Sequence, residues 1–351
     1  GPDKGNRQSS IVNRKSSMPS LYVVEQGAKI HKEHRRLVVK KDEQELQSIP
    51  LLKIDQVLIF GNVGITTPAL TWLMGQDIEV VFCDQQGRYK GRVVGQTSGH
   101  SQLRRLQYRR VDTPLFAVNT ARIIVQAKLH NSRTLLQRYQ RQLHQAELAT
   151  AIDRLAELKE RANRTHTVNS LLGLEGVGAA VYFEVLPRLF KHDYWRFDKR
   201  VRRPPTDPIN VLLSFGYTLL TRQLEFAVER VGLDPYLGCL HADSYNRPSL
   251  ALDLTEEFRS IVVDSVVLRC LNSELITPAN FSQQDDSERP LLLDEAGRNR
   301  FIQEFEARLA LTFTHPASEE KVTYRRCFEL QARAMARAFQ TDGLYQPFLV
   351  R

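Results

Sequence analysis

The spacing of apolar residues changes once along the chain, near residue 96, and this change constrains the fold more than any other feature. Before that point the apolar residues form short runs bounded by glycine, aspartate or charged residues, which is typical of β-strands. Strands are predicted at 21–24, 36–40, 56–60, 79–83 and 88–94, with one helix at 67–74. After residue 96 the period is helical. The sequence therefore predicts an α+β fold, with a small β-rich domain at residues 20–95 and a larger all-α domain at 96–351.

The helices of the second domain have recognisable ends. We expect them at about 114–143, 145–162, 168–187, 208–231, 250–272, 295–311 and 318–340. Thr113 is the expected N-cap of the first helix, Pro208 begins the fourth and Gly232 ends it. A chain of 351 residues suggests two domains rather than one. Residues 1–19 are polar, and we expect a disordered tag or linker there, with Gly1 and Pro2 as a protease scar.

The charge of the chain favours a polyanionic partner. It has 49 Lys and Arg against 40 Asp and Glu, for a formal net charge of +9. Arginines also cluster, at 104–105, 109–110, 200–203 and 325–326. Arginine binds phosphate through two parallel hydrogen bonds, so some of these clusters are predicted DNA contacts. A solvated helix face explains any single pair equally well.

Cysteine spacing and hydropathy bear on the compartment. Cys83, Cys239, Cys270 and Cys327 have no CxxC spacing, so we interpret them as reduced thiols of a cytoplasmic protein. No uninterrupted apolar run is long enough to span a bilayer, and no signal peptide is evident. We therefore expect no membrane partner.

Residues 238–259 place one histidine ahead of a helix with two carboxylates on one face. His241 precedes a loop, and the helix that follows, with Ser249 as its expected N-cap, carries Asp253 and Glu256. These two residues are three apart and share a helix face. Histidine and carboxylates together suit a divalent metal ion. On spacing alone, a solvated helix face accounts for the two carboxylates equally well.

Glu175 stands alone in a run of small and apolar residues, 171–183. A carboxylate is costly to bury unless a metal or a positive side chain compensates it. The small neighbours would allow close approach by other backbone or by DNA. A metal ion and an arginine partner are the two interpretations of this residue.

Taken together, these residues resemble the CRISPR-associated adaptation integrase family, the first Cas protein. Glu175, His241 and Glu256 match the three-ligand metal site of that family, and Asp253 matches the acidic position one helical turn earlier. Segments 203–220, 331–333 and 345–348 also fit, so the likeness extends over roughly residues 20–350. Some relatives have aspartate at the position of Glu256, which keeps the oxygen ligands and changes their reach.

The resemblance implies a metal-dependent DNA endonuclease and integrase that inserts captured DNA, called spacers, into a CRISPR array by 3′-OH transesterification. Mg²⁺ or Mn²⁺ would be the cofactor. The resemblance also implies double-stranded DNA as substrate, a homodimer formed through residues 20–95, and a second Cas protein as partner. The alternatives are a transposon-encoded integrase of the same superfamily and a non-catalytic DNA-binding scaffold.

The remaining candidates surround this site. Asp253 is a ligand, a group that orients His241, or an arginine partner, and we favour the orienting role. Asn210 and Tyr217 share a helix face, and Tyr217 is either a DNA contact or a core tyrosine. The predicted DNA contacts are Arg200, Arg202, Arg203, Asn210, Tyr217, Arg247 and Arg259. Local salt bridges are the alternative for Arg247 and Arg259.

Overall fold

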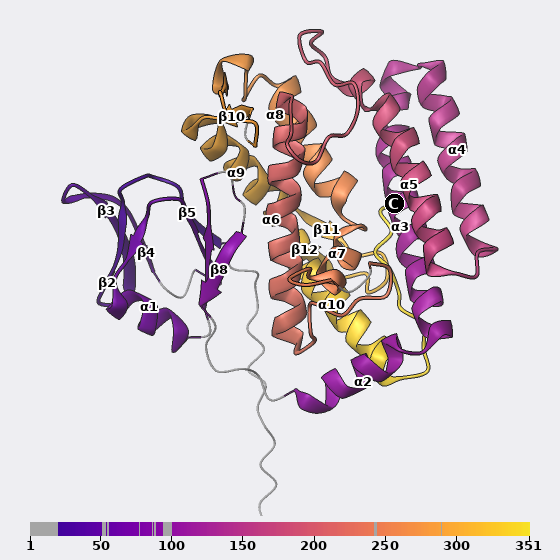
Figure 1. Cartoon of the computed structure of the whole chain (residues 1–351), viewed down its shortest axis with the longest axis horizontal. Helices are drawn as coiled ribbons and strands as arrows, with labels where there is room; N and C mark the ends of the chain where they lie inside the picture. Colours follow the sequence, from indigo (N-terminus) through magenta and orange to yellow (C-terminus); the bar gives the residue numbers. More distant parts are fainter. Residues whose placement is uncertain are drawn as a thin grey trace, which may run out of the picture.

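The computed structural model describes residues 20–50, 54, 56–76, 78–85, 87, 89–93, 100–241, 244–288 and 290–351. It places a β-rich region beside a larger helical region (Figure 1), which confirms the predicted α+β fold class. The predicted tag or linker, residues 1–19, lies outside the described residues, as do residues 94–99 at the predicted boundary.

Two four-stranded sheets form the β-rich region, with orders β1-β5-β7-β8 and β4-β3-β2-β6. Their strands are β1 (Ser20–Val23), β2 (Lys29–Glu33), β3 (Arg36–Lys41), β4 (Gln44–Pro50), β5 (Gln56–Phe60), β6 (Gly64–Ile65), β7 (Glu79–Cys83) and β8 (Tyr89–Val93). The region also holds α1 (Thr67–Met74), which was predicted. Strands β2 and β4 were not predicted, because they are rich in charged and polar residues and lack a clear apolar alternation.

Strand β5 connects the cores of the two regions, and all five of its residues are buried. Val57 and Ile59 face the core of the β-rich region, whereas Leu58 and Phe60 belong to the core of the helical region. Phe60 packs edge-on against Phe215, with ring centroids 6.2 Å apart. Because successive strand residues point to opposite faces, the first sheet is buried on both faces and joins the two regions.

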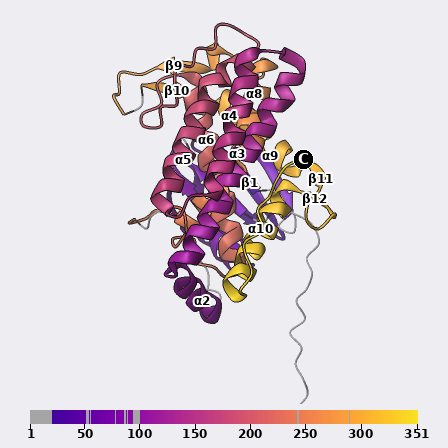
Figure 2. The same ribbon diagram turned by 90° about the vertical axis from the view of Figure 1, so that its right-hand side faces the viewer.

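The helical region surrounds α6, which lies between the first sheet and the group formed by α3, α4 and α5 (Figures 1 and 2). Its helices are α2 (Ser101–Val111), α3 (Pro114–Leu143), α4 (Ala146–Asn163), α5 (Val168–Val185), η2 (Leu186–Leu189), α6 (Pro208–Val231), α7 (Ser249–Thr255), the π-helical η3 (Arg259–Asp264), α8 (Ser265–Asn272), η4 (Pro278–Asn280), α9 (Glu295–Ala310) and α10 (Tyr324–Gln340). The predicted ends of α6 are confirmed, because Asp207 accepts a hydrogen bond from the Asn210 N–H and Gly232 ends the helix at φ +96°.

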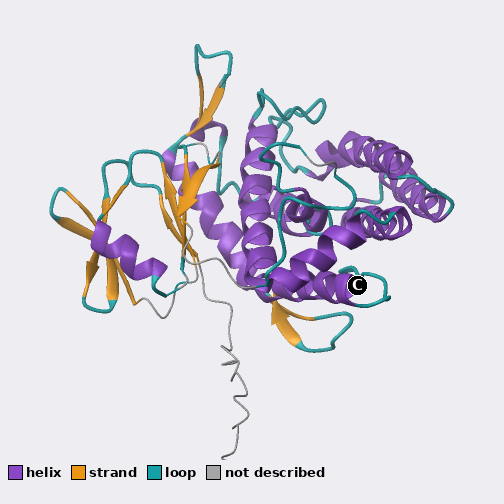
Figure 3. Ribbon diagram, turned by 60° about the horizontal axis from the view of Figure 1, so that its bottom comes forward, coloured by secondary structure: helices purple, strands orange, loops and turns teal. Residues whose placement is uncertain are grey.

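Two predictions in the helical region differ from the structure. The single helix expected at 250–272 is α7, η3 and α8, and Ser249 is the first residue of α7 rather than its N-cap. The helix expected from residue 318 begins at Tyr324, because residues 321–323 pair with 312–314 as a β-ribbon. The ribbons, β9 (Phe281–Gln283) with β10 (Leu291–Leu293) and β11 (Thr312–Thr314) with β12 (Lys321–Thr323), are short additions to an otherwise helical region (Figure 3).

One helical segment, Val168–Leu189, has the length and composition of a membrane-spanning helix, although Glu175 and Glu184 interrupt its apolar run. In the structure α5 packs against α3 and α4. It also carries Glu175, whose carboxylate pairs with Lys128 of α3. That pairing compensates the carboxylate charge within the helical region.

Candidate metal centre

The three predicted metal ligands come from different elements and gather beside α3. Glu175 lies on α5, His241 precedes the loop before α7, and Glu256 is the C-cap residue of α7. Helix α5 can lie close to α3 because residue 178 is glycine: a Cβ there would stand 2.2 Å from Leu129 Cδ2. This close packing brings Glu175 towards the other two residues.

Asp253 fixes the position of the histidine. The fully buried carboxylate accepts hydrogen bonds from the backbone N–H groups of residues 239–241 at 2.6, 2.9 and 3.0 Å. Its Oδ1 also lies 2.8 Å from His241 Nδ1. The opposite ring nitrogen, Nε2, then faces Glu256 Oε1 at 3.8 Å. Since both oxygens of Asp253 are engaged, this geometry favours the orienting role over that of a ligand.

Lys128 of α3 was missed by the sequence analysis and stands between two of the candidate ligands. Its Nζ pairs with Glu175 Oε1 and lies 2.5 Å from Glu256 Oε2. The three side chains are 12%, 16% and 3% exposed, respectively, so the cluster is largely shielded from water. Lys128 lies in the long basic helix α3, 47 residues before Glu175 in the sequence. No motif distinguishes this lysine from its neighbours.

The donor set fits a divalent cation. Two carboxylates and an imidazole nitrogen are ligands that Mn²⁺ and Mg²⁺ accept. The Lys128 ammonium is a stand-in for such an ion, because both glutamates direct an oxygen at this one positive charge. Among the described residues, no three His, Cys, Asp or Glu side chains already enclose a common point. The Lys128 ammonium lies between the carboxylates of Glu175 and Glu256, and this accounts for their separation.

Positive charges also keep Glu256 ionised. Burial alone would raise the pKa of this carboxyl, but Arg259 and Lys128 together hold the pKa well below its ordinary value. Arg259 Nε lies 3.0 Å from Glu256 Oε1, and this is the same oxygen that faces His241. An ionised carboxylate is the form that binds a metal.

Tyr217 lies behind Arg259 as a core residue. Its ring centroid is 4.5 Å from the Arg259 guanidinium carbon and 5.5 Å from that of Arg200. Its hydroxyl donates a hydrogen bond of 2.6 Å to Asp264 Oδ1. Tyr217 is only 8% exposed, so of the two predicted roles the structure favours the core tyrosine.

The structure corrects the prediction of a DNA contact at Asn210. This residue is fully buried, and its Oδ1 accepts hydrogen bonds from Arg200 Nη1 at 2.7 Å and from the Val201 N–H at 2.9 Å. Its amide donates to the Lys199 carbonyl at 2.9 Å. Asn210 therefore holds Arg200 in place and presents no free group to a ligand.

The other predicted DNA contacts lie nearer the surface. Arg202 and Arg203 are exposed, and Arg247 is half-buried in the loop before α7. That loop also presents Tyr245, which is 95% exposed and was not singled out from the sequence. An exposed aromatic ring beside an arginine is suited to stacking on a nucleotide base.

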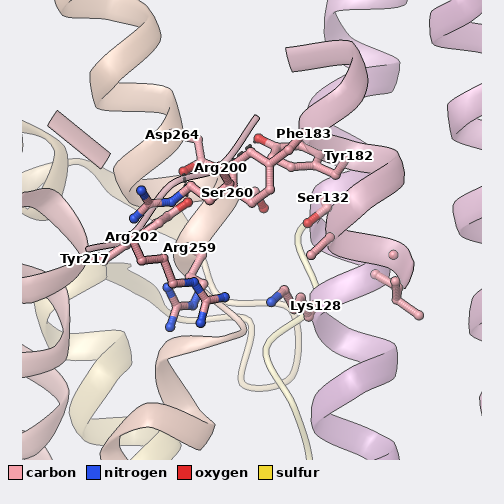
Figure 4. A pocket seen from close by; sticks show the side chains of 13 residues that line it. Lys128, Ser132, Tyr182, Phe183, Arg200, Arg202, Tyr217, Arg259, Ser260 and Asp264 are labelled. Atoms are coloured by element: carbon pink, nitrogen blue, oxygen red, sulfur yellow. Dashed lines mark hydrogen bonds between the residues drawn. The ribbon is translucent and has the colours of Figure 1, made fainter. Parts of the chain in front are cut away.

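A basic pocket adjoins the carboxylates. It has about 470 Å³ of empty space, is open to solvent, and is lined by Lys128, Arg200, Arg202, Arg259, Tyr217, Tyr182, Ser132, Ser260 and Asp264, among others. In Figure 4, Lys128 extends from α3 towards the guanidinium groups of Arg202 and Arg259. Four basic side chains around one pocket suit an anion such as a phosphate group.

The C-terminal segment supports the residue next to Glu256. Glu257 Oε2 accepts hydrogen bonds from the Phe348 N–H at 2.8 Å and from Gln331 Nε2 at 3.3 Å. Gln331 also donates to the Tyr345 hydroxyl at 2.8 Å. The segments 331–333 and 345–348, singled out from the sequence, thus meet at the chain turn that carries Glu256.

Comparison with known proteins identifies the family. The chain matches the family of CRISPR associated protein Cas1 over residues 21–307. It is 37% identical over 327 residues to a Cas4 exonuclease/Cas1 endonuclease fusion of Rhodospirillum rubrum, covering 92% of this chain and 56% of the fusion. It is 36% identical to a Cas1 endonuclease of Thermus thermophilus, covering 94% of this chain and 98% of the relative. It also resembles a chain of a solved Cas6-RT-Cas1–Cas2 complex, with a TM-score of 0.81 and 27% identity over 95% of this chain and 36% of that one.

The extent of these matches differs between relatives. The chain spans 56% and 60% of the length of two fusion relatives, and 98% of the length of the Thermus protein. The family match covers most of the chain and includes Glu175, His241 and Glu256. On this evidence, the chain belongs to the Cas1 family of CRISPR-associated proteins.

Proposed function

We propose that this chain is a metal-dependent DNA endonuclease and integrase of CRISPR adaptation, which joins the 3′-OH of captured DNA to a CRISPR repeat. One observation carries the proposal. Glu175 and Glu256 meet at a single ammonium, with the Nε2 of His241 beside Glu256, although these residues are far apart in the sequence. Such a buried gathering of ionised groups is typical of a functional centre.

The chemistry follows from the residues around this centre. Mg²⁺ or Mn²⁺, held by Glu175, Glu256 and His241, would neutralise charge on the phosphate that is attacked. Asp253 accepts the Nδ1 proton of His241 in a hydrogen bond and so leaves Nε2 free as a ligand. The nucleophile is a DNA hydroxyl or water, so no side chain needs to form a covalent intermediate.

The proposed partners are double-stranded DNA, a second copy of this chain and a second Cas protein. The basic pocket and the exposed Arg202 and Arg203 support the first. The solved complex that shares this fold contains Cas2, which supports the third. A two-fold homodimer formed through the β-rich region would present two centres to the two ends of one DNA fragment. The proposed location is the cytoplasm, in keeping with four buried cysteines that show no CxxC spacing.

The two alternatives are less well supported. A scaffold without catalysis has no need of a buried carboxylate such as Glu256, which is 4% exposed and costly to desolvate. A transposon-encoded integrase would use the same chemistry, but relatives of 33–36% identity that align with nearly this whole chain are CRISPR-associated endonucleases.

Strand transfer tests this proposal. The purified chain, with and without the second Cas protein, is supplied with Mn²⁺, a short DNA duplex and a supercoiled plasmid carrying a repeat. Alanine at Glu175, His241 or Glu256 should reduce integration at least ~100-fold, because the remaining ligands misplace the ion. The control is Glu157→Ala, which removes an exposed carboxylate paired with Arg154 and should change nothing. Near-normal integration by the His241→Ala protein would contradict the proposed centre.

A further inference from the structure

Lys128 contacts the two glutamates that are proposed to hold the metal. Its ammonium bridges Glu175 Oε1 and Glu256 Oε2, and its side chain is only 12% exposed. A divalent cation held between these two carboxylates would therefore occupy the place of the ammonium. A lysine placed this way cannot keep both contacts once a metal ion takes the same two oxygens.

The formal charges of the cluster support a competition. Asp253, Glu175 and Glu256 supply three negative charges, and Lys128 and Arg259 supply two positive charges. In the metal-free protein Lys128 thus prevents two buried carboxylates from facing each other uncompensated. With a divalent ion bound, the same ammonium would face a like charge at short range, which is unfavourable.

The basic pocket gives the displaced side chain a place to go. Lys128 already lines this pocket, one helical turn before Ser132 on the same face of α3. Arg200, Arg202 and Arg259 line its other side (Figure 4). The carboxylate of Asp264, which lines the pocket, accepts hydrogen bonds from the Tyr217 and Tyr182 hydroxyls at 2.6 and 2.7 Å. If the Lys128 ammonium enters the pocket, it adds to a positive charge that no free carboxylate among the described residues of the pocket balances. An anionic phosphate bound there would neutralise this charge.

We propose that Lys128 is the internal counter-ion of the metal-free centre, that a divalent metal ion displaces it, and that its side chain then turns into the basic pocket. The inference rests on the proposed function, because it assumes that Glu175 and Glu256 bind the metal. It explains why the two carboxylates are held together before the metal arrives. It also makes Lys128 the residue that weakens metal binding, since each metal ion must first break two ion pairs.

Metal binding by the full chain tests this inference without using activity. Mn²⁺ affinity is measured by calorimetry for the wild type, Lys128→Met and Lys128→Gln, with Tm measured with and without Mn²⁺. Both variants lack the competing charge and should bind Mn²⁺ at least ~10-fold more tightly. Their metal-free Tm should be lower than that of the wild type, and Mn²⁺ should raise it by more. The glutamine variant keeps a hydrogen-bond donor between the carboxylates, which supports folding if the methionine variant fails to fold.

Two further variants sharpen the result. Lys128→Arg keeps the charge and should retain the weak, wild-type-like affinity. Lys40→Met removes a lysine that is paired with Glu33 in the β-rich region and should leave Mn²⁺ affinity unchanged. Equal or weaker Mn²⁺ binding by both Lys128→Met and Lys128→Gln, with normal binding by the wild type, would overturn the role of Lys128 alone. Absence of Mn²⁺ binding in the wild type as well would overturn the proposed metal centre and this inference with it.

Discussion

At the scale of single residues, the arginines at 200–203 have two different roles. One supports the fold, and the others are available to a ligand. The guanidinium of Arg200 is half-buried and donates to Asn210 Oδ1, to the Val201 carbonyl and to Ser214 Oγ at 2.7, 2.7 and 2.9 Å. Arg202 and Arg203 are exposed. The three arginines are close in sequence, yet burial gives them different roles.

Salt dependence of DNA binding should reveal this difference. Each phosphate contact contributes about 0.9 to the slope of log affinity against log salt, so Arg202→Ala/Arg203→Ala should flatten the slope by about 2. The loss of affinity should be similar for every duplex sequence. Filter binding at several salt concentrations measures it, with Glu175→Gln as the variant that keeps DNA binding. A double variant that binds random DNA normally and loses only discrimination for the repeat would identify these arginines as base readers.

At the scale of elements, the contact between α3 and α5 builds the carboxylate cluster. A Cβ at Gly178 would lie 2.2 Å from Leu129 Cδ2, whereas a Cβ at Gly176 would meet nothing within 4 Å. Gly178 follows Glu175 by one turn, and Leu129 follows Lys128 directly. The distance between the two helices therefore sets the distance between Glu175 and Lys128.

A matched pair of substitutions on α5 tests this contact. Gly176→Ala should raise the free energy of unfolding by about 0.5–1 kcal/mol, because alanine favours a helix and has open space there. Gly178→Ala offsets the same gain by forcing Leu129 to move within the core, and we expect net destabilisation of about 1 kcal/mol or more. Denaturant unfolding measures both. Equal stabilisation by the two substitutions would mean that α3 and α5 are not in close contact.

Elements and site residues were predictable to different degrees. The ends of α6 follow from Asp207-Pro208 and Gly232, because capping is local chemistry. The pairing of His241 with Asp253 was anticipated from their places around one loop. The π-helical turn at 259–264 and the Lys128 contact were not, since both depend on packing between helices that no local spacing records. Asn210 was misread because its partners lie in an irregular segment, whose position no local spacing records.

At the scale of the whole molecule, a charged cluster joins the β-rich region to α6. Arg92 of β8 lies 3.0 Å from Glu79, pairs with Glu229, and stands 3.9 Å from Glu225, which also pairs with Arg222. Three carboxylates here face two arginines. Burial raises the pKa of Glu225 to about 7, against the opposing effect of Arg222 and Arg92 and with help from Glu229 and Glu79.

The pH dependence of stability should report this cluster. Glu225 has a folded-state pKa of about 7 against an ordinary 4.5, so its proton is bound more tightly in the folded protein. Its contribution to stability is present below about pH 4.5 and is lost as pH rises through 7. In the wild type, the free energy of unfolding should therefore fall by on the order of 2 kcal/mol between about pH 5 and pH 8, and Glu225→Gln should abolish this fall. Thermal unfolding across this range measures it.

The control for this titration is Glu157→Gln, which changes an exposed carboxylate of α4 that is 62% accessible in its side chain. It should keep the pH dependence of the wild type. An identical fall of Tm with pH in the wild type and in Glu225→Gln would show that Glu225 is ionised throughout and that another group controls the stability.

The proposed metal centre requires that Glu175, His241 and Glu256 hold one divalent ion. Electron paramagnetic resonance of Mn²⁺ bound to the full chain, with nitrogen hyperfine spectroscopy on ¹⁵N-histidine-labelled protein, tests it directly. We expect one bound Mn²⁺ per chain that is coupled to one imidazole nitrogen. The coupling should be lost in His241→Ala, and Glu175→Gln should bind the ion weakly or not at all. Unchanged Mn²⁺ binding and unchanged nitrogen coupling in His241→Ala would contradict it.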